Sequence, residues 1–253
     1  MHHLTVGLIA FACVFGSALL GLYVRTLLPV DHLSDDSIGV VKLTTGLIAT
    51  MAALVLGLLI SSAKTSFDTV NAEVTHDAAN VILLDRALAR YGPETQEIRS
   101  LLKHAVATGV QKVASGDPAQ LADLHSAEAY KRAEYIEHKL EELSPQNDMQ
   151  RRLQARAIEM TDNVLAVREL GLLQAAGTTP TPLLVTLVLW LCIIFGAFGL
   201  FTPPNATVTI ALFLGALSTS IAIFLILEMT TPLEGVITVS LVPMREALAV
   251  LGQ

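Results

Sequence analysis

Long apolar runs and charged stretches alternate along the chain. Four apolar runs are long enough to cross the hydrocarbon core of a bilayer, which takes about 20 helical residues; they cover residues 4–24, 38–60, 183–201 and 206–227. The first run is expected to remain as a helix and not to serve as a signal peptide, because its apolar core is too long and only His2 and His3 precede it. The pattern predicts four transmembrane helices in two pairs, with a water-compatible region between Ser61 and Pro182.

The water-compatible region is expected to be helical. Its apolar residues recur at helical spacing, and nothing in it alternates with the two-residue period of a strand. Three proline-containing stretches predict the ends of its helices, at residues 91–95, 115–120 and 143–148. Asp117 followed by Pro118 is typical of a helix start. Neither Gly nor Pro occurs between Ile60 and Tyr91, so the second membrane helix is expected to continue unbroken into this region.

The tail after the fourth apolar run has a different character. Pro232 and Gly235 predict a turn, and residues 236–240 alternate apolar and polar positions, which indicates a short extended segment. Pro243 then begins a short amphipathic helix whose apolar side includes Leu248. This helix is expected either to lie on the membrane surface or to dock on the helical region.

These elements predict an all-α integral membrane protein with four transmembrane helices in two pairs and a cytoplasmic helical bundle inserted between helices two and three. The expected regions are the first helix pair at 1–60, the bundle at 61–182, the second helix pair at 183–228 and the cytoplasmic tail at 229–253. Composition agrees with this class, since 53% of the residues are hydrophobic and only 15% are charged. The net charge of −7 argues against a nucleic-acid-binding protein, which would carry a basic face.

The distribution of Lys and Arg predicts the orientation. Thirteen of the 16 basic residues lie between Lys64 and Arg168, and Arg245 follows the fourth helix. The loop at 25–37 holds one arginine against three aspartates, and the loop at 202–205 is uncharged. Because cytoplasmic loops are enriched in basic residues, the bundle and both termini are expected on the cytoplasmic side.

The sequence contains no constellation typical of catalysis or cofactor binding. Glu73 and His76 have the Glu-x-x-His spacing of di-iron helix bundles, and Asp77 and Asn80 continue that face, but such sites need a second pair that the chain lacks. A polar network between helices is the preferred interpretation. The chain also lacks a Gly-rich phosphate loop and a nucleophile motif. We therefore expect no enzymatic activity, no cofactor and no bound metal, and we expect both cysteines, which lie inside apolar runs, to be inert thiols.

Two stretches give the chain a family resemblance. One is Phe67–Leu88, "FDTVNAEVTHDAANVILLDRAL", and the other is Pro232–Leu248, "PLEGVITVSLVPMREAL". Together with the two helix pairs around a helical insert, they resemble the bacterial bestrophin-like membrane domain, a family of unassigned function that more often has Glu at Asp77. The resemblance implies a multi-pass protein of the bacterial inner membrane, similar to bestrophins, which are oligomeric anion channels. Bestrophins narrow their pore with bulky apolar and aromatic residues of the second helix, whereas the second helix here has no aromatic residue before Phe67.

Small and polar residues recur along one face of the second predicted helix. At about 100° per residue they fall within an arc of about 100°, which Lys64 also shares; the residues considered as a possible pore lining are Lys42, Gly46, Thr50, Ala53, Gly57 and Ser61. One interpretation is a packing seam, because small residues let membrane helices approach closely. The other is the wall of a water-filled pore in an oligomer, with bulky residues such as Ile48 and Leu59 facing other helices.

Two charged residues lie near the ends of predicted membrane helices. Lys42 lies about 6 Å inside the outer end of its helix, and the preferred interpretation is that its stem lies in lipid while its amine reaches the headgroups. The alternative is a ring of ammonium groups at the mouth of an oligomeric pore, which would attract anions. For Glu228, at the inner end of the fourth helix, the preferred interpretation is the same extension toward the headgroups.

Two classes of function follow from these features. The first is an oligomeric ion channel that conducts passively, with anions slightly favoured, along a pore lined by the second helix. Its expected partners are the lipid bilayer, inorganic ions and further copies of the chain. The narrow apolar stripe between Phe67 and Leu88 favours such a homo-oligomer, because its helix extends beyond the neighbours that one membrane's width provides. The alternative is a membrane-anchored scaffold or sensor whose cytoplasmic bundle binds a partner.

Overall fold

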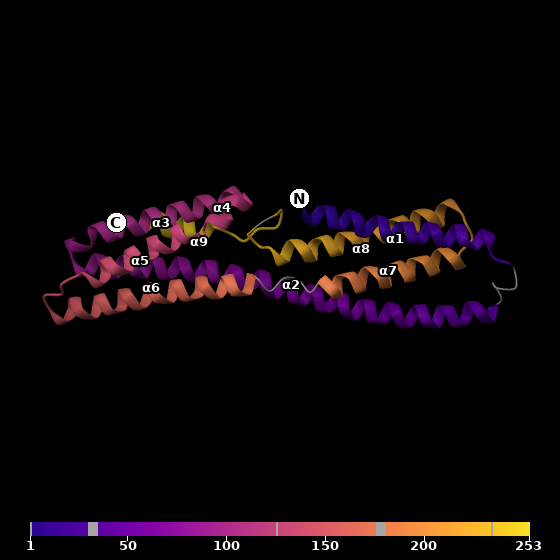
Figure 1. Ribbon diagram of the computed structural model, residues 1–253, viewed down its shortest axis with the longest axis horizontal. Coiled ribbons are helices and arrows are strands. Elements are labelled where there is room, and N and C mark those ends of the chain that lie inside the picture. Colours follow the sequence, from indigo (N-terminus) through magenta and orange to yellow (C-terminus); the bar gives the residue numbers. More distant parts are fainter. Residues whose placement is uncertain (1, 30–34, 125, 176–180, 234) are drawn as a thin grey trace. The chain divides into compact units, whose positions relative to one another are not determined.

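The computed structural model describes residues 2–29, 35–124, 126–175, 181–233 and 235–253 (Figure 1). All regular secondary structure in these residues is helical, and they contain no β-strand. The predicted all-α class is therefore confirmed. The chain divides into two compact units: unit 1 comprises residues 1–66 and 178–231, and unit 2 comprises residues 67–177 and 232–253.

Unit 1 holds the apolar helices. Four helices of the described chain are long and apolar enough to cross a membrane: α1 (His2–Leu27), α2 (Asp35–Tyr91), α7 (Thr181–Phe201) and α8 (Ala206–Thr230). Unit 1 contains α1, α7, α8 and the first part of α2 (Figure 1). By the length and composition of these helices, the chain is a membrane protein.

Within unit 1, α1 packs most extensively on α7 and not on the helix that follows it in the sequence. Glycines allow this close approach. A Cβ on Gly21 would overlap the carbonyl oxygen of Gly196, and a Cβ on Gly199 would overlap the carbonyl oxygen of Ala18. We call this contact the α1–α7 seam. Because the two backbones touch directly, no side chain fits between them at these positions.

Two polar contacts accompany the α1–α7 seam. The Ser17 hydroxyl donates a hydrogen bond to the carbonyl oxygen of Cys192 at 2.6 Å. Near the other end of the same contact, the Arg25 guanidinium donates to the carbonyl oxygen of Leu200 at 3.3 Å. Since Leu200 lies in the last turn of α7, where backbone carbonyls lack helical partners, the arginine satisfies one of them and complements the helix dipole.

The helix α8 runs antiparallel to α1. The ring centroids of Phe11 and Phe213 lie 5.4 Å apart in an edge-to-face arrangement, and the Thr231 hydroxyl lies 3.3 Å from Nε2 of His3. Glu228, one turn before Thr231, is only 4% exposed. The expectation that Glu228 extends toward lipid headgroups is therefore wrong, because its side chain is buried.

The helix α2 is continuous over 57 residues. This confirms the prediction that the second apolar run continues to Tyr91 without a break, as expected for a segment with no helix-breaking residue. Its residues up to Ser66 belong to unit 1, and those from Phe67 onward belong to unit 2. We call the part of α2 up to Ser66 its membrane part. Few of its residues are covered by the rest of the subunit: 17% of those in its most apolar stretch are buried, against 33% in α8.

Unit 2 is a helical bundle that includes the second part of α2 (Figure 1). Its other main helices are α3 (Gln96–Ser115), α5 (Ala127–Glu141) and α6 (Asp148–Ala175). Buried apolar residues from all four helices and from the tail form one core, which consists of Val81, Leu84, Leu88, Ile98, Leu102, Ile136, Leu140, Ala157 and Leu251.

The three predicted breaks in this region are confirmed. The chain turns through η2 (Pro93–Thr95), leaves α3 before α4 (Pro118–Asp123), and leaves α5 before α6. Between α3 and α4, Gly116 has a φ of 62° and the Asp117 side chain accepts a hydrogen bond from the Ala119 N–H at 3.0 Å. The break between α4 and α5 was not predicted, because neither Gly nor Pro marks it.

The tail docks on the bundle. Of the two positions expected for its helix, the membrane surface and the helical region, the second is therefore the one observed. The helix α9 (Val242–Val250) packs on α3, and its Ala247 is fully buried. Residues 236–240 contain no strand, so the extended segment expected there is not part of a sheet. The described residues contain no strand with which this segment could pair.

Candidate conduction face

The membrane part of α2 has three faces with different surroundings. The first packs on the core that unit 1 shares among its helices, and its residues are the least exposed of this part: Thr45, Ala52, Leu59 and Ala63, at 6%, 4%, 3% and 1%. At about 100° per residue these four positions span an arc of only about 40°. Ile48 also packs against this core, as expected for a bulky residue on that side.

The second face is the one predicted from the sequence, and we call it the small-residue face. All six of its residues are exposed: Lys42, Gly46, Thr50, Ala53, Gly57 and Ser61. Beyond the local turns of α2, no atom lies within 4 Å of the position that a Cβ would take on Gly46 or Gly57. The small-residue face is therefore not a seam inside this subunit, and it is open to another subunit, to lipid or to water.

Large apolar side chains form the third face, which we call the leucine face. Leu43, Leu47, Leu54 and Leu58 are between 62% and 77% exposed. The centre of this face lies about 80° around the helix from the centre of the small-residue face. Side chains of this type suit lipid or another apolar helix. These four leucines are thus centred on a different side of α2 from the six residues of the small-residue face.

The Thr50 hydroxyl of the small-residue face bonds within α2, where it donates to the carbonyl oxygen of Gly46 at 2.7 Å. Further along the helix, the Thr65 hydroxyl donates to the carbonyl oxygen of Ser61 at 2.9 Å. Such bonds one turn back satisfy the donor in an apolar setting, and each hydroxyl oxygen keeps its capacity to accept. Lys42 stands exposed at one end of the face and supplies a positive charge.

A similar glycine on α8 has different surroundings. A Cβ on Gly215 would lie 3.2 Å from Cζ of the Phe195 ring, which α7 contributes. Gly215 therefore makes room for an aromatic ring of the same subunit. At this position α8 does not offer the open surface that α2 offers at Gly57.

The polar residues considered for a metal site lie on α2 in unit 2. Nδ2 of Asn80 lies 3.1 Å from Nδ1 of His76, a contact within one helix. Among the described residues, no group of three or more His, Cys, Asp and Glu side chains is placed to hold a metal ion. The network between helices expected around Glu73 and Asp77 stays a prediction.

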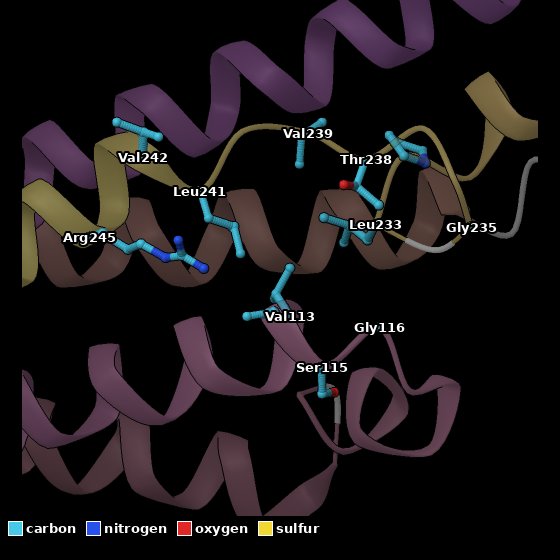
Figure 2. Close-up of a pocket in the computed structure, with 12 residues that line it drawn as sticks. Val113, Ser115, Gly116, Leu233, Gly235, Thr238, Val239, Leu241, Val242 and Arg245 are labelled. Atoms are coloured by element: carbon cyan, nitrogen blue, oxygen red, sulfur yellow. The ribbon is translucent and has the colours of Figure 1, made fainter.

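A cavity of about 370 Å³ lies in unit 2, between the end of α3, the loop that follows α8, and α9 (Figure 2). Figure 2 shows Arg245 of α9 at this cavity together with Val113 of α3 and Leu241 of the tail. The guanidinium is complementary to the negative end of the α3 dipole. The lining combines this one cation with apolar and hydroxyl side chains, and it contains no pair of groups arranged for acid–base catalysis.

Comparison with known families agrees with this architecture. The family model described as Bestrophin-like domain matches residues 12–244, which is most of the chain. The chain belongs to the Bestrophin-like domain family. The resemblance predicted from the sequence is thereby confirmed, and the matched part of this Bestrophin-like domain includes the whole small-residue face. No curated protein and no solved structure matches the chain.

Sequence patterns missed the α1–α7 seam of this Bestrophin-like domain. The available signal was the spacing of small residues four apart, as in Ser17 and Gly21 of α1 and Cys192 and Gly196 of α7. The same spacing occurs on α2, so it does not say which face is covered. A second feature that the sequence analysis missed is the burial of Asp85 of α2. This residue is the single acidic one in an apolar stretch, and it is only 4% exposed.

Proposed function

We propose that this Bestrophin-like domain is the subunit of an oligomeric ion channel, in which ions pass along the small-residue face of α2. The observation that carries the proposal is the exposure of all six residues of that face, on a helix whose opposite side packs on its own subunit. Small side chains leave room beside the helix, and the threonine and serine oxygens can accept hydrogen bonds from water. The family's likeness to the bestrophins supports the same function.

The proposed path requires several copies of the chain. Only 17% of the residues in the most apolar stretch of α2 are buried within the subunit, so neighbouring copies can contact most of its surface. In a closed ring, each α2 would turn its small-residue face to the axis and its leucine face toward the adjacent copy or lipid. The separation of about 80° between the two faces is compatible with such a ring.

Anions are the ions that this face favours. Lys42 is the one charged residue among its six residues, and none of the six carries a carboxylate. Copies of Lys42 around an axis would form a ring of ammonium groups at one mouth of the path. Such rings attract anions and repel cations. The selectivity of the path is therefore expected to decrease when Lys42 is replaced by Gln.

The accessibility of an introduced cysteine tests the proposal. In a variant without the natural Cys13 and Cys192, Thr50→Cys is reconstituted in lipid vesicles and exposed to a small charged thiol reagent. Because thiolate is the reactive species and forms in water, we expect fast modification together with a change in anion flux. Two matched variants on the same helix serve as controls: Ala52→Cys on the packed face and Leu54→Cys on the leucine face, at positions that are 4% and 67% exposed.

The outcomes separate the path, the oligomer and the channel itself. If Thr50→Cys reacts no faster than Leu54→Cys in vesicles that conduct, the path does not follow this face. A monomeric mass in lipid nanodiscs would contradict the oligomer. Purified oligomers that carry no flux of any small ion would contradict the channel and favour a membrane-anchored scaffold.

A further inference from the structure

A buried carboxylate in unit 2 binds the end of the tail. Asp85 of α2 is only 4% exposed, and Arg99 of α3 donates two hydrogen bonds to it, at 2.8 and 3.0 Å. The backbone N–H of Gly252 donates to the same carboxylate at 3.2 Å. One buried group therefore joins α2, α3 and the tail.

Basic side chains of α3 complete this contact. The Arg99 guanidinium also donates to the main-chain oxygen of Gln253 at 2.9 Å, and the Lys103 ammonium donates to the carbonyl oxygen of Leu251 at 2.7 Å. Gly252 has a φ of 81°, a conformation that favours glycine. We call this arrangement the tail clasp: Asp85, Arg99 and Lys103 with the backbone of residues 251–253. Its side chains bind backbone groups of the tail.

The tail clasp keeps its carboxylate charged. Burial by itself would raise the pKa of Asp85, but the hydrogen bonds from Arg99 and Gly252 and the positive charges of Arg99 and Lys103 together hold that pKa below its ordinary value. A buried carboxylate of this kind depends on its partners, because an uncompensated charge in the same place is strongly unfavourable.

Apolar packing at the clasp is tight on one side and loose on the other. Leu251 is 1% exposed and belongs to the core of unit 2, with Val81 and Leu88. Beside it lies a cavity of about 180 Å³, which Ile82 and Val250 help to line. Residues 251–253 are thus anchored by one leucine and the clasp, next to this cavity.

The rest of the tail is anchored at a few positions. Within α9, Ala247 is fully buried, whereas Val242 and Val250 at its two ends are 54% and 42% exposed. In the preceding loop Val239 is 5% exposed and its N–H donates to the carbonyl oxygen of Pro232 at 3.0 Å, whereas Val236 is 82% exposed. Of the buried anchors, Ala247, Leu251 and the clasp lie in α9 or after it, so they hold this helix directly.

We propose that α2 and α3 form a recognition site for residues 247–253 of the same chain, and that this site acts as a latch. When closed, it holds α9 on the bundle; it opens without unfolding the bundle. Pro232 follows α8 after a single residue, so the tail that the latch holds begins directly after the fourth apolar helix. This inference does not depend on ion conduction.

Proteolysis of the full-length protein tests the latch. Arg245 lies within α9, so trypsin can cleave after it only when that helix undocks and unwinds. Asp85→Asn keeps the shape of the side chain but removes its charge. We expect cleavage after Arg245 to become at least about tenfold faster, because cleavage of a transiently opened segment follows the population of the open state. Mass spectrometry of the released fragment measures the rate.

Two further variants make the test specific. Asp148→Asn removes an ion pair of the same unit, in which Arg151 and Asp148 are 70% and 81% exposed, and it is expected to leave the rate unchanged. Leu251→Ser opens the latch while Asp85 and Arg99 stay paired. It therefore decides the question even if Asp85→Asn fails to fold.

Two outcomes would overturn the latch. One is a rate of cleavage after Arg245 that equals the wild-type rate in both Asp85→Asn and Leu251→Ser, with helical content preserved. The other is faster cleavage at basic residues throughout unit 2 in Leu251→Ser, because the tail would then be an inseparable part of the bundle's core. Faster cleavage confined to α9 supports the latch.

Discussion

Two small-residue surfaces on the membrane helices of this Bestrophin-like domain have opposite surroundings. On the α1–α7 seam, the space that a Cβ would take on Gly21 or Gly199 is already filled by a carbonyl oxygen of the facing helix. On the small-residue face of α2, the space beyond Gly46 and Gly57 is open. Both surfaces repeat small residues about one helical turn apart.

The comparison shows that one sequence pattern serves two physical purposes. A glycine without a Cβ lets a second backbone approach, which maximises van der Waals contact in a bilayer where no hydrophobic force holds helices together. The same missing Cβ leaves free volume when no second backbone is present. Only the presence or absence of a neighbouring helix distinguishes the two cases.

The largest expected difference in stability between the two surfaces comes from replacing one glycine on each by alanine. Gly21→Ala should lower the free energy of unfolding by about 3 kcal/mol, the upper end of typical overpacking costs, because the obstacle is backbone. Gly57→Ala should not lower it and should raise it by up to about 1 kcal/mol, because alanine forms helices better than glycine and the space of its Cβ is open. Unfolding in detergent, followed by circular dichroism, measures both. An equal loss in the two variants would mean that another subunit packs tightly on α2.

A bulky side chain at Gly57 sharpens the comparison further. If the small-residue face lines a path, Gly57→Leu should remove most of the anion flux from reconstituted vesicles and leave the oligomer intact. If the face is a seam between subunits, the same change should cost about 1–3 kcal/mol of packing and weaken assembly. Flux and mass, measured on the same preparation, separate the two results.

The smallest expected effect concerns hydroxyl groups on the two surfaces. Ser17→Ala removes a hydrogen bond between α1 and α7 and should cost about 0.6 kcal/mol, an average value for such bonds in membrane proteins. Thr50→Ala removes only a bond within α2, so the stability of the subunit should hardly change. A larger loss for Thr50→Ala than for Ser17→Ala would contradict the assignment of the α1–α7 seam as the tighter surface.

Local features of the fold were predictable from the sequence. Helix lengths followed from apolar runs and from breaks, and the continuity of α2 followed from the absence of Gly and Pro between Ile60 and Tyr91. Gly116 and Asp117 end one helix and begin the next because their conformations and side chain suit those positions. The residues of the small-residue face were also predictable as a set, since helical geometry alone places them on one side.

Long-range features were not predictable, because they depend on residues far apart in the chain. Glu228 of α8 is buried, and the ionised Asp85 depends on Arg99 and on the backbone of the tail. No periodicity within a helix contains this information. A side chain without these partners would have been expected on the surface.

The sequence by itself determined that the chain has four membrane-length helices and that six small or polar residues share one face of α2. Helical periodicity and apolar length are local properties, so they are contained in neighbouring residues. Only the tertiary structure decided which small-residue surface is covered. Ser17 and Cys192 meet across 175 positions of sequence, and it is this pairing of α1 with α7 that closes one surface and leaves the face of α2 open.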